Sequence, residues 1–222
     1  MTSRRLPVWM PRRRDGDSAN EPPFDPTSWS GALVVMLFVG AALWAVQLVN
    51  AANDYSLNRF GLRPRRIDGL WGIVTEPFLH LSNSHLLSNT VPVVGVGWVL
   101  LLSGVRTWLT VSAVVIVLSG VATWLVAPSG LVVGAGGLAL GWMGYLLARA
   151  YFSRRVRWIV VAVCVLFFFG TFFFTLVPSF NKDVSWQAQA CGLGAGVVAG
   201  ALLHPRNPRR HPKRRSPGPA VS

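Results

Sequence analysis

Two polar side chains, His85 and Asn89, lie four residues apart in a stretch of the chain that is otherwise rich in apolar residues. If the stretch is helical, positions i and i+4 share one face, so the imidazole and the carboxamide point the same way. Both groups donate hydrogen bonds without a formal charge, and such a pair can hold the oxygen of a polarised carbonyl group. The alternative is a structural polar contact at the beginning of a helix.

A second polar group, Ser185, Gln187 and Gln189, begins the last apolar run of the chain. Polar side chains are expensive to bury within a membrane and are usually functional there. We therefore expect this group to face the same cavity as His85 and Asn89. The alternative is a set of ordinary polar residues at the start of a helix.

Other kinds of chemistry find little support in the sequence. Histidines are few, no HExxH motif occurs, and no phosphate-binding P-loop is present, so we expect neither a metal site nor a cofactor. The two cysteines, Cys164 and Cys191, lie inside apolar runs. We interpret them as small apolar residues of helices and not as a disulfide framework.

The composition indicates the solvent in which these residues lie. Hydrophobic residues make up 52% of the 222 positions and charged residues 13%, against roughly 25% charged in a typical soluble domain. The chain lacks the polar residues needed to cover a water-soluble core. It is therefore predicted to be an all-α membrane protein.

Six apolar runs are long enough to cross a bilayer, which takes about 20 residues per helix. The uncharged stretch between Arg106 and Arg149 is too long for one helix, and Pro128 and Gly130 divide it into two. The predicted spans are residues 31–49, 85–102, 108–127, 134–150, 158–177 and 185–203. An even number of spans places both termini on the same side of the membrane.

The distribution of positive charge predicts which side that is. If the termini are cytoplasmic, 16 of the 21 lysines and arginines lie on the cytoplasmic side, where these residues are usually enriched. The five on the other side are Arg59, Arg63, Arg65, Arg66 and Lys182. We predict cytoplasmic tails at residues 1–30 and 205–222, a membrane domain at residues 31–204, and a location in the plasma membrane.

The basic tails account for most of the net charge of +13. Nucleic-acid binding is one interpretation of such a charge. The tails are short and rich in proline, however, and attraction to anionic lipid headgroups explains them without a further partner. We therefore expect the lipid bilayer, and no nucleic acid, as the partner of the tails.

Glycines recur at four-residue spacing in the fourth and sixth spans. Gly137 and Gly141 form one such step, and Gly192 and Gly196 form another. Small residues allow helix backbones to approach closely in a membrane. The pattern predicts that these two spans pack face to face, near the centre of the bundle.

Three segments together resemble the rhomboid family of intramembrane serine proteases. They are PFLHLSNSHLLSNT (residues 77–90), GAGGLALGWMGYLLAR (residues 134–149) and SWQAQACGLGAG (residues 185–196). The second has the form common among actinobacterial members. The resemblance implies a six-helix rhomboid bundle in which His85 and Asn89 are the oxyanion-stabilising pair.

The same resemblance exposes two departures at the catalytic positions. Where the family carries its serine nucleophile this chain has Gly136, and where it carries its histidine base this chain has Gln189. Glycine offers no hydroxyl, and the glutamine amide does not titrate near neutral pH, so this pair cannot perform covalent catalysis. The sequence therefore predicts a pseudoprotease.

Three functions remain in competition. The first is an inactive rhomboid-like protein that binds transmembrane segments of client membrane proteins, with a phenylalanine-rich fifth span as a lateral gate or as ordinary lipid contact. The second is an active protease with a displaced dyad, although no spacing places Ser129 or Ser185 beside a base. The third is an unrelated channel, transporter or scaffold. Inverted repeats and charges at mid-membrane, which are typical of transporters, are not evident.

Overall fold

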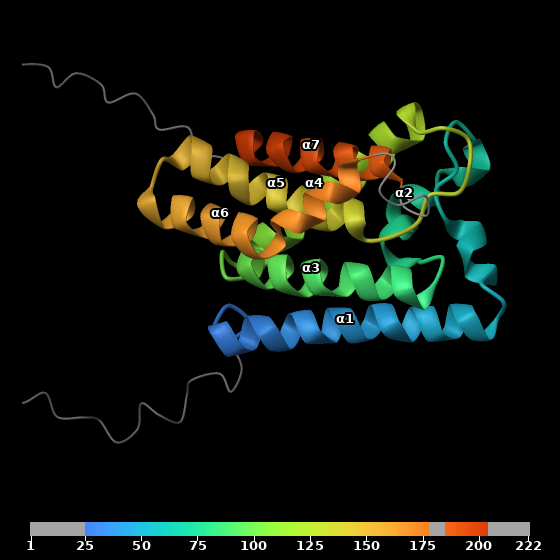
Figure 1. Cartoon of the computed structure of the whole chain (residues 1–222), viewed down its shortest axis with the longest axis horizontal. Helices are drawn as coiled ribbons and strands as arrows, with labels where there is room; N and C mark the ends of the chain where they lie inside the picture. Colours follow the sequence, from blue (N-terminus) through green and yellow to red (C-terminus); the bar gives the residue numbers. More distant parts are fainter. Residues whose placement is uncertain (1–24, 178–184, 204–222) are drawn as a thin grey trace, which may run out of the picture.

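The computed structural model of the chain describes residues 25–177 and 185–203, which form a helical bundle (Figure 1). The long helices are α1 (Trp29–Ala52), α3 (Asn83–Leu101), α4 (Val105–Val126), α5 (Gly136–Ser153), α6 (Val156–Phe169) and α7 (Trp186–Leu202). Short elements connect α1 to α3, namely η2 (Ser56–Phe60), η3 (Ile67–Gly69), α2 (Gly72–Thr75) and η4 (Glu76–Phe78). A 3₁₀ segment, η5 (Gly170–Leu176), continues α6.

Within the described residues, four helical segments are long and apolar enough to cross a bilayer: α1, α3, α4, and α6 together with η5. The glycine-rich helices α5 and α7 are not among them, and α7 has 17 residues. Twelve of the 18 residues of α5 are buried among other helices, so most of its side chains face protein and not lipid. The prediction of six spans is thus supported for four segments, while α5 and α7 remain predicted spans.

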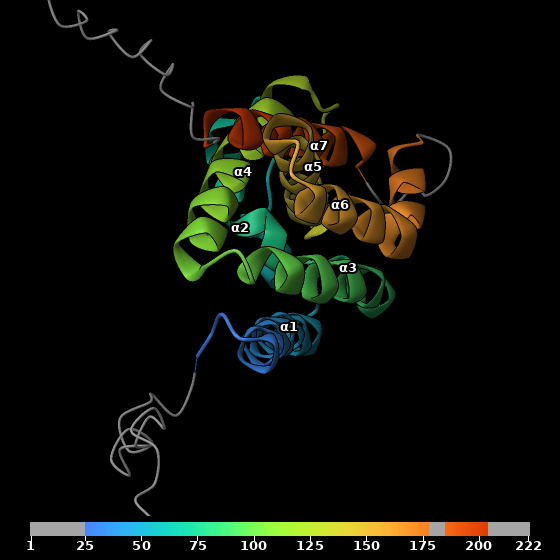
Figure 2. The ribbon, with the colours of Figure 1, turned by 90° about the vertical axis from the view of Figure 1, so that its left-hand side faces the viewer.

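The helix α5 lies in the middle of the bundle and packs on α3, α4, α6 and α7. The helix α1 packs on α3 at the edge, as the end-on view shows (Figure 2). The described chain begins before α1 and ends after α7 at the same end of the bundle (Figure 1). The connection from α1 to α3 covers the opposite end. The side of the membrane on which each end lies stays a prediction.

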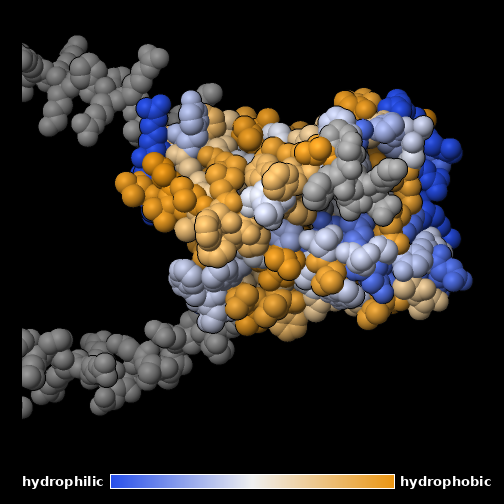
Figure 3. All heavy atoms as spheres, in the orientation of Figure 1, coloured by the Kyte–Doolittle hydropathy of each residue, from blue (hydrophilic) through white to orange (hydrophobic). Residues whose placement is uncertain are grey.

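The flanks of the bundle expose large apolar side chains. Phe38 on α1 is 73% exposed, Val163 on α6 is 60% exposed and Phe167 is 80% exposed. Figure 3 shows this apolar surface along the bundle, with the hydrophilic residues gathered mainly at the end formed by the α1–α3 connection. Such continuous exposure is unfavourable in water and favourable against lipid. The protein is therefore a multi-pass membrane protein.

Two predicted spans begin or end differently in the structure. Gly134, predicted to open the fourth span, lies in the loop before α5 with a φ of +123°, which is outside the helical region. The predicted fifth span loses its α-helical form after Phe169 and continues as the 3₁₀ segment η5. Hydropathy alone missed both features because an apolar residue can occupy helix, loop or 3₁₀ backbone equally well.

The α1–α3 connection is fastened to the helices by polar contacts. Asn50 Nδ2, near the end of α1, donates to Asn58 Oδ1 at 2.9 Å, and Asn58 Nδ2 donates to the His80 carbonyl at 3.4 Å. Leu62 pairs through its backbone with Val132 in the α4–α5 loop. These contacts hold the connection against the end of α1 and against the loop that leads into α5.

Candidate functional site

The beginning of α3 places His85 and Asn89 on its buried face. Ser82 caps the helix, because its hydroxyl accepts a hydrogen bond from the His85 backbone N–H at 3.1 Å. One turn separates His85 from Asn89, and the two residues are 8% and 2% exposed. Both side chains therefore face the interior of the bundle from the end that carries the α1–α3 connection.

The loop before α5 passes directly over these two side chains. A Cβ atom at Gly134 would lie 2.8 Å from His85 Nε2 and 3.5 Å from Asn89 Nδ2. The left-handed φ of Gly134 already favours glycine, and the closeness of the imidazole leaves no room for a side chain. The backbone N–H of Gly134 donates to the Glu76 carbonyl at 2.8 Å, which ties this loop to η4.

Gly136 and Gln189 meet beside Asn89. A Cβ atom at Gly136 would lie 2.8 Å from Gln189 Nε2 and 3.3 Å from Asn89 Oδ1. Gln189 is 3% exposed, so its amide occupies the space that a side chain at position 136 would need. The structure thus brings together His85 and Asn89 from α3, Gly136 from α5 and Gln189 from α7.

Close packing of α5 on α7 makes this meeting possible. A Cβ atom at Gly192 would overlap the carbonyl group of Gly137, and one at Gly196 would overlap that of Gly141. The four glycines singled out in the sequence therefore lie where the two backbones touch. A single methyl group at Gly192 or Gly196 would force the helices apart and move Gln189 relative to Gly136.

His80 is a site residue to which the sequence assigned no role. It is fully buried, and its Nε2 accepts a hydrogen bond from the backbone N–H of Ala135 at 3.3 Å. Its ring also packs edge-on against that of His85, with centroids 5.2 Å apart. Burial, followed by the charge of His85, lowers the pKa of His80 to about 3, so the ring is neutral and suited to accept this bond. The signal in the sequence that could have identified His80 as a site residue is its position in the PFLH segment, residues 77–80.

Glu76 is a buried acid that sequence reasoning passed over. It is 5% exposed, and burial raises the pKa of its carboxyl from 4.5 to about 8. Among the described residues, its Oε2 has no hydrogen-bond partner. The carboxyl is therefore largely protonated at neutral pH. An acid in a loop is normally exposed, so the sequence contained no signal for this burial.

Further buried polar atoms of the site lack a partner within the described part of the chain. They include Asn89 Nδ2, a donor, and Gln189 Oε1, an acceptor. Buried polar atoms are normally hydrogen-bonded, so an unpartnered donor and acceptor in one place mark a position where a ligand can bind.

The structure places the two serines weighed above for a displaced dyad, Ser129 and Ser185, and also the two hydroxyl residues that flank Asn89. Ser185 caps α7 by accepting from the Ala188 backbone N–H at 3.3 Å. Ser88 donates to the His85 carbonyl at 2.8 Å, and Thr90 donates to the Leu86 carbonyl at 2.8 Å. Ser129 is exposed in the α4–α5 loop. Capping and backbone hydrogen bonds of this kind account for Ser88, Thr90 and Ser185.

Comparison with protein families gives a match to the Rhomboid domain over residues 68–206, which include α2 to α7 and all the site residues above. The chain belongs to the rhomboid family. Uncharacterized proteins of Mycobacterium tuberculosis and Mycobacterium bovis are 35% identical to this rhomboid over 181 residues, which cover 78% of its chain and 75% of theirs. An uncharacterized protein of Mycobacterium leprae is also 35% identical over 181 residues, with 78% and 71% covered.

Proposed function

We propose that this rhomboid has no peptidase activity and instead binds transmembrane segments of other membrane proteins. The observation that carries the proposal is the contact between positions 136 and 189. The family's nucleophile position is a glycine, and the amide of the glutamine at the base position lies 2.8 Å from where a side chain would begin.

The chemistry of the two residues supports inactivity. Peptide hydrolysis through an acyl-enzyme needs a hydroxyl that attacks and a base that takes its proton. Gly136 has no hydroxyl group to attack the peptide bond, and a carboxamide such as that of Gln189 does not accept a proton at neutral pH. His85 and Asn89 alone can polarise a carbonyl group, which favours binding over bond cleavage.

The unpartnered atoms of the site support binding of a polypeptide. A peptide group carries one N–H donor and one C=O acceptor. The Asn89 Nδ2 donor and the Gln189 Oε1 acceptor complement these two groups. A client segment whose backbone opens locally would satisfy both atoms, which are otherwise buried without partners at a cost in free energy.

A lateral groove supports entry from the bilayer. It lies mainly between α3 and α6, has a volume of about 1020 Å³ and is lined mostly by apolar residues. The Phe169 ring closes part of it against α3, since a Cβ atom at Gly95 would lie 2.7 Å from Phe169 Cε1. Movement of this ring would open a path for an apolar helix, which fits the lateral gate that was one of the two interpretations of the phenylalanine-rich span.

The absence of peptidase activity is tested with a fluorophosphonate probe, which labels activated serines, on membranes containing the protein. The double variant Gly136→Ser with Gln189→His is the positive control, because it restores the family's nucleophile and base. We expect label on the double variant and none on the native protein. Label on the native protein would contradict the proposal, and mapping the modified serine would identify a displaced nucleophile.

Client binding is tested with a photoreactive residue placed in the groove at Val91 of α3, which is 64% exposed. The matched control is Leu118 on α4, an exposed apolar residue outside the groove. With a single-span test protein in the same membrane, we expect crosslinks from position 91 and few from position 118. Equal crosslinking from both positions would show that the groove does not select transmembrane segments. Flux of ions or solutes through liposomes that contain the protein would then point to a channel or transporter.

A further inference from the structure

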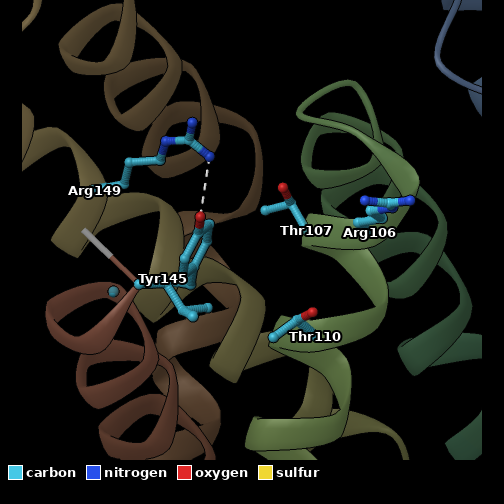
Figure 4. A pocket seen from close by; sticks show the side chains of 7 residues that line it. Arg106, Thr107, Thr110, Tyr145 and Arg149 are labelled. Atoms are coloured by element: carbon cyan, nitrogen blue, oxygen red, sulfur yellow. Dashed lines mark hydrogen bonds between the residues drawn. The ribbon is translucent and has the colours of Figure 1, made fainter. Parts of the chain in front are cut away.

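A second cavity lies at the end of the bundle opposite the candidate site. It has a volume of about 280 Å³ and lies between α4, α5 and α7 (Figure 4). Its polar lining consists of Arg106, Thr107, Thr110, Tyr145 and Arg149. The lining thus combines two guanidinium groups with three hydroxyl groups and, among the residues that the structure describes, contains no carboxylate.

The guanidinium of Arg149 is held in place before any ligand arrives. Its Nη1 donates to Tyr145 Oη at 3.0 Å, and its Cζ lies 3.8 Å from the centroid of the Trp158 ring. Tyr145 is itself only 3% exposed. One N–H group serves the tyrosine, which leaves the other four donors of the guanidinium for further partners. A fixed fork of donors is the geometry that binds carboxylate and phosphate oxygens in pairs.

The wall formed by α4 adds a second positive charge. Arg106 and Thr107 belong to the first turn of α4, across the cavity from Arg149 and Tyr145 (Figure 4). Unpaired N–H groups at a helix N-terminus also favour a negative charge. Thr110 lies about one turn further along the same helix and offers a hydroxyl that donates or accepts.

The two arginines lack a charged partner in the described part of the chain. The ion pairs formed there, Arg63 with Asp68 and Arg66 with Asp68, belong to the α1–α3 connection at the other end of the bundle. Both arginines line one cavity, and their two positive charges favour an anion in it.

We propose that this cavity binds a phosphate group, of the kind that an anionic phospholipid headgroup presents. A cavity of about 280 Å³ is far larger than the roughly 10–15 Å³ of such volume that one water molecule needs, so it has room for a phosphate group. The cavity lies where the helices end, and the apolar Leu203 lines it beside the charged groups. This combination favours a lipid headgroup, and free phosphate is the other source of the same chemistry.

The test uses the full-length protein in nanodiscs of phosphatidylcholine, with and without phosphatidylglycerol, and counts retained phosphatidylglycerol by native mass spectrometry. The variants are Arg106→Gln and Arg149→Gln. The matched control is Arg155→Gln, which removes the same charge from an exposed position outside the cavity. Arg106 is exposed, so its variant is expected to fold even if loss of the Trp158 contact destabilises the Arg149 variant.

We expect retention of phosphatidylglycerol to weaken about tenfold or more in each cavity variant, as for a lost hydrogen bond to a charged group, and to stay unchanged in the Arg155 variant. A parallel titration with inorganic phosphate, followed by thermal unfolding, separates the two sources. Stabilisation by phosphate that needs Arg106 supports the site with a soluble ligand. Equal retention by all four proteins, with no phosphate effect that depends on Arg106, would overturn the proposal.

Discussion

At the scale of single residues, the candidate site is a set of polar groups sealed from water by close packing. His80, His85, Asn89 and Gln189 are each less than a tenth exposed, and Glu76 is as deeply buried. The carboxamide of Gln189 lies against the glycine at position 136, where a side chain at that position would begin. The site therefore holds groups that can donate and accept hydrogen bonds, and neither position 136 nor position 189 carries a hydroxyl or an imidazole.

Glu76 leads to a prediction about stability and pH. Burial raises the pKa of its carboxyl in the folded protein to about 8, above the ordinary value of 4.5, so the folded protein holds this proton more tightly than the unfolded chain. Its contribution to stability is complete below pH 4.5 and is lost as the pH rises toward about 8. Glu76→Gln keeps the shape and removes the titration.

We expect the midpoint of thermal unfolding of the native protein in detergent to fall over this pH range, and that of Glu76→Gln to fall less. Scanning calorimetry or dye-monitored unfolding at several pH values measures both. Parallel curves for the two proteins would mean that the carboxyl reaches water in the folded state.

At the scale of elements, the pair α5 and α7 sets the geometry of the site. Their glycines allow backbone contact, and this contact brings Gly136 and Gln189 within reach of each other. A bulkier residue at the crossing would separate the helices. The lipid offers no hydrophobic drive to bring them together again, because lipid tails are as apolar as the side chains.

Two alanine substitutions on α7 test this packing. Gly196→Ala would place a methyl group on the Gly141 carbonyl, whereas Gly194→Ala points into open space. Overpacking costs about 1–3 kcal/mol and occasionally more, whereas alanine in place of an unconstrained helical glycine is stabilising by up to about 1 kcal/mol. We expect Gly196→Ala to lower the unfolding midpoint clearly and Gly194→Ala to leave it unchanged or raise it. Similar losses for both variants would argue against backbone contact at the crossing.

At the scale of the whole molecule, the bundle has two chemically different ends. The candidate site and the α1–α3 connection occupy one end, while Arg106, Arg149 and both described chain ends occupy the other (Figures 1 and 4). The end that carries Arg106, Arg149 and both described chain ends is the one that the positive-inside rule assigns to the cytoplasm.

This arrangement predicts the topology of the protein in the cell. Reporter fusions after residue 203 and within the α1–α3 connection should give opposite results. A fluorescent protein that folds only in the cytoplasm should be bright at the C-terminus, and alkaline phosphatase should be active in the connection. The reverse pattern would place the candidate site on the cytoplasmic side and would contradict the positive-inside assignment.

Many features of this protein could be predicted from the sequence alone. Apolar runs predicted where the long helices lie, because hydropathy and helix-breaking residues act locally along the chain. The three motifs predicted the rhomboid family, which the comparison with known families confirmed. The residues at the two positions that the resemblance assigns to the catalytic pair, Gly136 and Gln189, could also be read from the sequence.

Other features depended on residues that are distant in the chain and meet only when the helices pack. The Gln189 amide lies against Gly136 because α5 and α7 touch, and Glu76 is buried because the α1–α3 connection folds back onto the bundle. Arg106 and Arg149 line one cavity because three helices pack around it. No local pattern encodes these distances, since they follow from the shapes of side chains across helix interfaces. Residue types thus determined that positions 136 and 189 carry no hydroxyl and no imidazole, and tertiary packing decided which polar groups lie together.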